Sequence, residues 1–272
     1  MNGDVRNDLP PCSNQVNGVV RSYPVILIDK DRFLQDTVSI CIEEQIRISI
    51  NDQHIATMVA TPDELTEFAV GFVVDEGILR GFHEIQSVRV DGTSVNLQTV
   101  PGVLIGKPDI EVRSSGGLGN VKLDNSESLP LSDCSVFTID SIFLAVDLLH
   151  DLSSTWKKTG GTHSAIILSG DNELVAYAED MGRHTAIDKV IGKALMKGVS
   201  LSSCCLTCTG RLPAGMIQKA YRVGIPLIIS NNAPFSSGID LANQLNLTVV
   251  GFVRKPRAII YSGTHRIQGA LQ

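Results

Sequence analysis

The densest group of side chains that could do chemistry lies in the segment AEDMGRHTAIDKVIGKAL, residues 178–195. Arg183 and His184 stand between an expected strand and an expected helix, a junction at which open α/β sheets bind ligands. His184 and Asp188 are four residues apart, so both could face one pocket, and Arg183 could hold an anion beside the helix N-terminus. The simpler alternative is that Asp180 caps the helix and Asp188 only orients His184.

Three further segments carry candidate binding groups. The glycine loop TGGTH ends in His163, which more often has a structural role than a catalytic one when it is judged alone. The turn VRKPR places three cations at a strand end, where arginine suits bidentate contact with phosphate, although an exposed hairpin turn is an equal alternative. Ser236 and Ser237 open a helix after the strand IPLIIS and add free N–H and hydroxyl donors.

The pair Cys205-x-x-Cys208 invites interpretation as a metal or redox site, but the segment SSCCLTCT has the composition of a strand. Positions three apart on a strand point to opposite faces, so the two sulfurs would not converge on one ion. No histidine is followed two residues later by glutamate, as a zinc deaminase requires. We therefore expect no metal, and in particular no zinc, and we assign these cysteines to the core.

The run VRSSGGLGNV, residues 112–121, is a glycine loop that could cradle a phosphate, act as a hinge or turn a corner. Its glycine spacing matches neither the dinucleotide fingerprint nor the lysine-ended phosphate loop. Taken alone, the run is most simply a surface loop.

The elements that must position these residues fall into two parts. Residues 1–20 are expected to form a disordered tail, because they are rich in Asn, Pro and Ser. A small α+β domain over 21–134 starts with a hairpin in which Ile46, Ile48 and Ile50 alternate with polar residues before an Asn51-Asp52 turn. A helix follows, and Thr61-Pro62-Asp63-Glu64 predicts its start as a capping box, with Gly77 as its end.

The second part, 135–272, alternates strands with amphipathic helices, which predicts a largely buried sheet flanked by helices. Helices are expected at 139–151, 184–197, 213–223 and 236–245. Strands are expected at 164–168, 174–178, 203–207, 225–230, 248–253 and 257–261.

Composition limits the function classes. The chain has 272 residues, of which 43% are hydrophobic, so it can bury a sizeable core. Its net charge of −6 argues against nucleic acid as a partner. We also expect no membrane as a partner, because no apolar run is long enough to span a bilayer and the start has no signal-peptide pattern, and the default location is cytoplasmic. Six cysteines are too few for a disulfide scaffold.

Long ordered segments, from IRISINDQHIATMVATPDELTEFAVGFVVDEGIL through AEDMGRHTAIDKVIGKAL to LTVVGFVRKPRAIIYSG, resemble the formate dehydrogenase accessory protein (FdhD) family over about residues 40–265. The resemblance implies an α+β N-terminal domain followed by an α/β three-layer C-terminal domain of cytidine-deaminase-like architecture without zinc, assembled as a homodimer. It also implies a sulfur carrier that accepts sulfur from a cysteine desulfurase and delivers it to the molybdenum bis(molybdopterin guanine dinucleotide) cofactor of formate dehydrogenase.

The three cations of the VRKPR turn and the helix start at Ser236 and Ser237 predict the cofactor-binding residues, which can be tested with a guanine nucleotide such as GDP. We expect them to be Phe252, Val253, Arg254, Lys255, Pro256 and Arg257, with Arg183, Ser236 and Ser237.

The family carries a Cys-Gly-x-Cys-Gly pattern in the glycine loop, where this chain has Gly116-Gly117-Leu118-Gly119-Asn120. Gly116 and Gly119 therefore stand at the positions of the two persulfide cysteines. A thiolate is both the nucleophile and the carrier of the extra sulfur, and glycine can serve as neither.

Three hypotheses follow, and whether the chain is an enzyme stays open among them. The first is an accessory protein that binds the cofactor without this sulfur chemistry. The second is a sulfurtransferase that uses another thiol: Cys134, Cys205 or Cys208. The third is an acid/base enzyme that acts on a nucleotide-like ligand through His163, His184 and Asp188.

Overall fold

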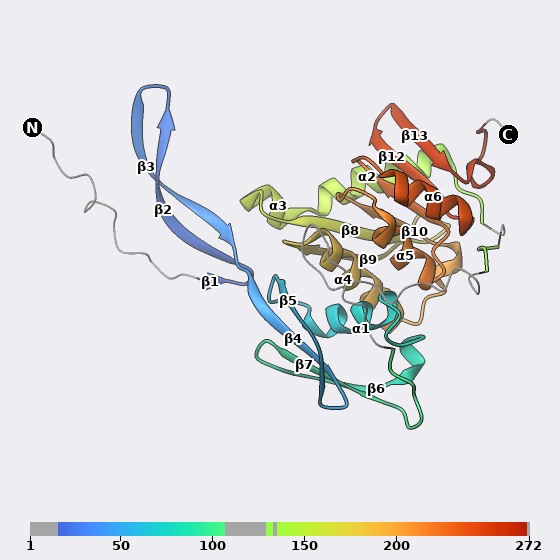
Figure 1. Ribbon diagram of the computed structural model, residues 1–272. Helices are drawn as coiled ribbons and strands as arrows, with labels where there is room; N and C mark the ends of the chain where they lie inside the picture. Colours follow the sequence, from blue (N-terminus) through green and yellow to red (C-terminus); the bar gives the residue numbers. More distant parts are fainter. Residues whose placement is uncertain (1–15, 107–128, 133–134, 271–272) are drawn as a thin grey trace, which may run out of the picture.

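The computed structural model describes residues 16–106, 129–132 and 135–270, which form three sheets (Figure 1). The strands of the first part are β1 (Val16–Asn17), β2 (Val20–Asp29), β3 (Arg32–Cys41), β4 (Glu44–Ile50), β5 (Gln53–Ala60), β6 (Ile85–Asp91) and β7 (Ser94–Thr99), with helix α1 (Leu65–Asp75) and the 3₁₀ turn Phe82–Glu84. Strands β1, β2 and β3 form one antiparallel sheet, and the order β5-β4-β7-β6 forms a second.

Strands β2 and β3 form a long antiparallel arm that projects from the body of the molecule (Figure 1). Its outer half is exposed on both strands and includes Ile28 and Phe33, which are 67% and 73% exposed. The base of the arm contacts helix α3 (Ser154–Thr159). The sequence prediction of a disordered segment to residue 20 is wrong for its end, because β1 and the first residue of β2 lie there.

The four-stranded sheet confirms the predicted hairpin. Ile46, Ile48 and Ile50 are fully buried, and Asn51 and Asp52 both adopt positive φ in the turn. The predicted capping box is wrong: α1 begins at Leu65, and Glu64 precedes it in a left-handed conformation without a side-chain cap. The Thr61 hydroxyl instead accepts the Met181 N–H, and Lys193 pairs with Glu64. Contacts with the second part have therefore replaced the local cap.

The second part is built on a six-stranded sheet of order β13-β12-β11-β10-β8-β9. Its strands are β8 (His163–Leu168), β9 (Leu174–Asp180), β10 (Cys205–Cys208), β11 (Leu227–Ser230), β12 (Thr248–Arg254) and β13 (Arg257–Ser262). Its helices are α2 (Ile139–Leu152), α3, α4 (Arg183–Met196), α5 (Ala214–Arg222) and α6 (Ser236–Gln244), with 3₁₀ turns at Leu201–Ser203 and Thr264–Arg266. The predicted alternation of strands and helices is confirmed.

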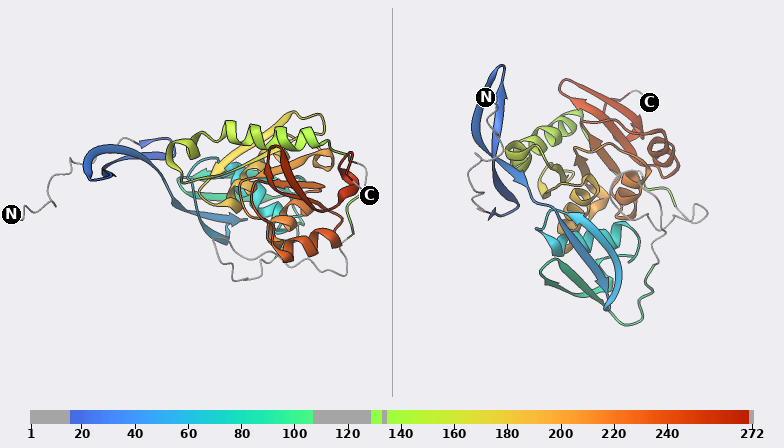
Figure 2. Two further views of the ribbon diagram at one scale, coloured as in Figure 1. Left: turned by 90° about the horizontal axis from the view of Figure 1, so that it is seen from above. Right: turned by 60° about the vertical axis from the view of Figure 1, so that its left-hand side comes forward.

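Helices cover both faces of this sheet (Figure 2). Helix α2 packs on one face with Ile166, Ile229 and Val250, and α4, α5 and α6 bury the other face in a second cluster. Strands β10, β11 and β12 are parallel, whereas β8 runs antiparallel to β10. The carboxyl ends of the three parallel strands therefore meet at one edge, where the strand direction also changes. That the second part has a cytidine-deaminase-like architecture remains a prediction.

The two parts meet through helices α1 and α4, which pack against each other at two glycines. A Cβ atom on Gly71 would overlap the Asp188 carbonyl oxygen, and one on Gly192 would overlap the Glu67 carbonyl oxygen. Ion pairs of the buried Lys189 flank this crossing, since its ammonium lies 2.6 Å from the partly exposed Asp63 and 2.9 Å from the buried Asp180. The first part is therefore joined to the second by close backbone packing and by buried charge.

Candidate functional site

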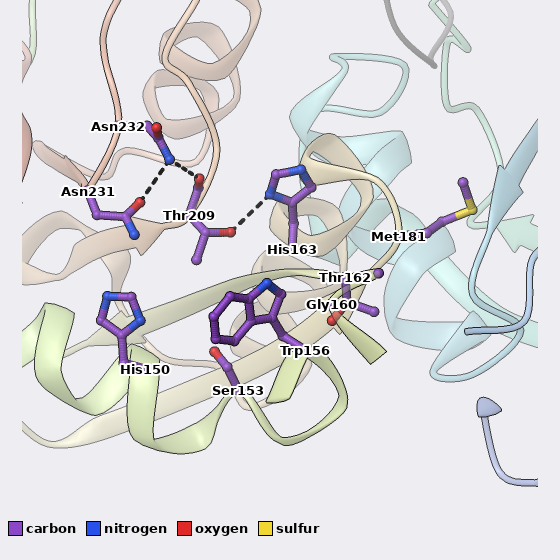
Figure 3. A pocket seen from close by; sticks show the side chains of 11 residues that line it. His150, Ser153, Trp156, Gly160, Thr162, His163, Met181, Thr209, Asn231 and Asn232 are labelled. Atoms are coloured by element: carbon purple, nitrogen blue, oxygen red, sulfur yellow. Dashed lines mark hydrogen bonds between the residues drawn. The ribbon is translucent and has the colours of Figure 1, made fainter. Parts of the chain in front are cut away.

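A cavity of about 350 Å³ lies at the carboxyl edge of the six-stranded sheet (Figure 3). Thr209 follows β10, Asn231 and Asn232 follow β11, and His163 begins β8. Trp156 of α3 closes one side of the cavity and is 49% exposed. Residues distant in the sequence meet here because parallel strands end at the same edge, which is the usual place for ligands in such sheets.

Hydrogen bonds hold the polar lining in place. His163 Nδ1 lies 3.0 Å from Thr209 Oγ1, which also accepts the Ser164 N–H at 3.1 Å (Figure 3). Asn232 Nδ2 donates to the Thr209 carbonyl oxygen at 2.8 Å and to Asn231 Oδ1 at 3.1 Å. These bonds fix the side chains that a ligand in the cavity would meet.

Two arginines lie near His163 in the cavity wall. Burial and the nearby cations Arg183 and Arg211 lower the pKa of His163, so its ring is held neutral. The Arg211 guanidinium lies 5.6 Å from the centre of the Phe235 ring, and Ser236 and Ser237 follow as exposed residues at the start of α6. Arg211 therefore affects His163 and also contacts Phe235, the residue before the start of α6.

The predicted VRKPR segment lies two strands further along the same edge. Arg254 ends β12 and pairs with Arg257 across the turn, and the Lys255–Pro256 peptide is cis. All four of these residues are exposed, whereas Val253 is buried. Phe252 has positive φ, and its N–H donates to the Asn232 carbonyl oxygen at 3.2 Å. The turn and the cavity therefore share Asn232.

Two of the predicted site residues lie elsewhere. His184 and Asp188 are buried and are not among the residues that line the cavity. Asp188 pairs instead with Lys219 of α5 at 2.7 Å. The alternative role for Asp180 is supported only in part: its Oδ1 accepts the Gly182 N–H, but Oδ2 accepts the Thr61 N–H and pairs with Lys189. The helix face that the sequence placed in a pocket packs against α1 and α5.

The prediction that Cys205 and Cys208 point to opposite faces is confirmed, because they lie in the two core clusters on either side of the sheet. Burial raises the pKa of Cys205 to about 12 and that of Cys208 to about 11. Cys134, Gly116 and Gly119 lie outside the described residues. Within the described ranges, no group of three or more His, Cys, Asp or Glu side chains is placed to hold a metal ion.

The sequence analysis did not predict several residues at this edge of the sheet. Thr209, Arg211, Asn231 and Asn232 all follow strands of the parallel set, and that position was the available signal. Cys41 was also missed: it is a half-buried thiol at the end of β3 that lines a smaller cavity of about 240 Å³, which shares Gly161 and Met181 with the first. Burial raises its pKa as well. No sequence pattern distinguished it.

Comparison with known proteins agrees with the resemblance. The model of the FdhD/NarQ family matches residues 41–268. "Sulfur carrier protein FdhD" of Methanothermobacter thermautotrophicus is 36% identical over 223 residues, covering 82% of this chain and 89% of the relative. Its namesake in Listeria monocytogenes serotype 4b is 32% identical over 268 residues, covering 92% and 99%.

A crystal structure of a chain from Desulfotalea psychrophila, assigned as a formate dehydrogenase accessory protein, superposes with a TM-score of 0.76. It covers 92% of this chain and 99% of its own length at 24% identity, so the likeness concerns the fold. Among the described residues, none of the helices has the length and apolarity needed to cross a membrane. On the family match and the two relatives, the chain belongs to the FdhD/NarQ family.

Proposed function

We propose that the protein is an accessory protein of formate dehydrogenase maturation that holds the molybdenum bis(molybdopterin guanine dinucleotide) cofactor at the carboxyl edge of its six-stranded sheet. Family membership supports the maturation role. One observation carries the site: Arg211, Arg254, Lys255 and Arg257 gather at this edge, and no acidic side chain in the described part of the chain forms an ion pair with any of them. Unpaired cations in a chain of net charge −6 fit a phosphorylated ligand.

Different residues are proposed to contact different parts of the ligand. Arg254 and Arg257 contact phosphate oxygens, and Lys255 adds a point charge beside them. Ser236 and Ser237 offer hydroxyl and backbone N–H donors at the start of α6, and Arg211 reaches the same region from the end of β10. The cavity beside His163 and Asn232 then receives a ring of the ligand. The bound cofactor supplies the molybdenum chemistry, and these side chains supply binding and orientation.

The thiols of the described residues are poorly suited to persulfide chemistry. Sulfur transfer needs a thiolate, yet the pKa of each described cysteine is raised by burial: Cys41, Cys204, Cys205 and Cys208. We therefore propose that the chain keeps the cofactor-holding function of its family and lacks the sulfur step at these thiols. Formate dehydrogenase and a cysteine desulfurase are its proposed partners in the cytoplasm. The acid/base alternative has less support, because His163 lines the cavity whereas Asp188 does not and is paired with Lys219.

A calorimetric titration with GDP tests the site. If each arginine contact with phosphate contributes about 1.5–3 kcal/mol, the double variant Arg254→Glu/Arg257→Glu should bind GDP more than tenfold more weakly than the unmodified protein. The matched control reverses two exposed arginines of the four-stranded sheet, Arg47→Glu and Arg89→Glu, and should leave the affinity unchanged. Equal affinities for the unmodified protein and the Arg254/Arg257 variant would remove the assignment.

We also propose a homodimer in which the arm is covered by a second copy of the chain. A two-stranded ribbon alone is marginally stable in water, and this one exposes apolar pairs on both faces, with Leu27 opposite Leu34 and Ile28 opposite Phe33. The double variant Ile28→Ser/Phe33→Ser should shift the mass measured by light scattering at micromolar concentration from dimer to monomer. The control Ile259→Ser, at another exposed apolar side chain, should stay dimeric. A monomeric unmodified protein would contradict the proposal.

A further inference from the structure

A buried cluster of charged side chains joins the two parts of the molecule away from the cavity. The Lys219 ammonium lies 2.6 Å from Asp75 Oδ1, 2.6 Å from Glu76 Oε1 and 2.7 Å from Asp188 Oδ1. No side chain of the four is more than 2% exposed. Asp75 and Glu76 come from the end of α1, Asp188 from α4 and Lys219 from α5. The cluster therefore connects the first part to two helices of the second.

Among the described residues, more acidic than basic side chains contact Lys219 directly. Three carboxylates face Lys219, and the second cation at the site is Arg222 of α5, whose guanidinium lies against Gly77 and donates to the Asp75 carbonyl oxygen at 3.1 Å. On α4, Lys189 turns away to Asp63 and Asp180, and His184 stands one turn before Asp188. From α1 the Phe72 ring, 5.9 Å from the Lys219 ammonium, adds no charge. The Lys219 ammonium therefore contacts three carboxylates, two of which, on Asp75 and Asp188, are fully buried.

The two aspartates carry matching unsatisfied atoms. Asp75 Oδ2 and Asp188 Oδ2 are both buried, and neither has a hydrogen-bond partner in the described ranges. Each of the two carboxyl groups also affects the pKa of the other. A proton held between the two carboxyl groups would remove one of the three negative charges that face Lys219 and would give these buried oxygens a hydrogen to share. Burial and the neighbouring carboxylates raise the pKa of both aspartates, in agreement with this arrangement.

We propose that Asp75 and Asp188 share one proton at neutral pH and that this proton is part of the contact between the two parts of the molecule. The unfolded chain does not hold it, since an exposed aspartate titrates near pH 4. A carboxyl group whose pKa is raised by folding stabilises the folded state fully below the unfolded pKa. That stability is lost as the pH rises toward the folded pKa. The contact between α1 and α4 is therefore weakened by alkali and strengthened by mild acid.

The variant Asp75→Asn tests the proposal, because asparagine has the shape of the protonated acid and cannot lose the proton. Urea unfolding is measured at several values between about pH 5 and pH 7. Relative to Asp75→Asn, the unfolding equilibrium constant of the unmodified protein should rise about tenfold per pH unit. The control Asp63→Asn removes a carboxylate from the neighbouring lysine, for which no shared proton is proposed, and should follow the unmodified protein.

An infrared spectrum of the unmodified protein at pH 7 provides a second readout that does not depend on any variant. A buried protonated carboxylic acid gives a C=O stretching band that ionised carboxylates lack, and this band should be present. It should disappear in Asp75→Asn, in which Asp188 is ionised against Lys219. Parallel pH profiles for the unmodified protein and Asp75→Asn, or no acid band at pH 7, would overturn the shared proton. If Asp75→Asn does not fold, the band alone decides.

Discussion

The substitution Gly71→Ala should lower the free energy of unfolding by at least about 3 kcal/mol, although it adds one methyl group. The added Cβ would overlap the Asp188 carbonyl oxygen on the facing helix, and backbone cannot turn aside as a side chain can. Helices α1 and α4 would have to separate, which would also lengthen the ion pairs that link the two parts, Lys189 with Asp63 and Lys219 with Asp75. Gly192→Ala should have a similar effect, because its Cβ would overlap the Glu67 carbonyl oxygen.

The control for this experiment is Gly224→Ala. Gly224 has φ of 78° and open space around its Cβ position, so alanine there meets only backbone strain of about 1–2 kcal/mol. Combining Gly71→Ala with Gly192→Ala should cost less than the sum of the two, since helices already apart accommodate the second methyl group. Urea unfolding measures all four variants. A loss for Gly71→Ala no greater than that for Gly224→Ala would contradict the close crossing.

The double variant Gly116→Cys/Gly119→Cys should gain persulfide sulfur that the unmodified chain does not accept in this loop. The resemblance implies that these glycines stand where the family has its two cysteines, with Ser114, Ser115 and Gly117 in its small-residue context. A cysteine at these positions would supply the thiolate that attacks the desulfurase persulfide, whereas burial raises the pKa of the Cys205 and Cys208 thiols. Mass spectrometry after incubation with a cysteine desulfurase and cysteine should show a gain of about 32 Da per sulfur atom.

A pair with the same spacing, Gly117→Cys/Asn120→Cys, tests whether position matters as well as the presence of a thiol. It should accept less sulfur than the pair at 116 and 119. A folded 116/119 variant that accepts none would mean that the loop is misaligned with the family or that the chain does not dock the donor. Sulfur already bound to Cys134, Cys205 or Cys208 of the unmodified chain would instead mean that one of these thiols carries the persulfide in place of the loop.

The helices and strands of the second part could be predicted because each has a local cause. Short apolar runs give β11 and β12, and amphipathic periodicity gives α4 and α5. The arm was missed because apolar residues occupy both faces of its outer half, so β2 and β3 lack the alternation that marks a strand with one buried face.

The errors in the candidate site arose because several side chains interact with residues that are distant in the sequence. Thr61 and Glu64 have the sequence of a cap, but Met181 and Lys193, more than a hundred residues away, take those groups. Asp188 was placed in a pocket with His184 on helical spacing alone, whereas α5 supplies Lys219 to pair with it. Positions at strand ends were more reliable: His163 and the VRKPR turn do lie at the carboxyl edge, because sheet topology carries them there.

The central claim, that this chain holds the molybdenum bis(guanine dinucleotide) cofactor at the edge formed by Arg211 and the VRKPR turn, is tested most directly by what the protein retains on purification. The full chain is produced in cells that make the cofactor, and the purified protein is analysed for molybdenum and for guanine nucleotide released by acid. The unmodified chain and the Arg47→Glu/Arg89→Glu control should retain both, with two guanine nucleotides for each molybdenum atom, and the Arg254→Glu/Arg257→Glu variant should retain neither. An unmodified chain without molybdenum and guanine nucleotide, or equal amounts of both in the Arg254→Glu/Arg257→Glu variant, would contradict the account.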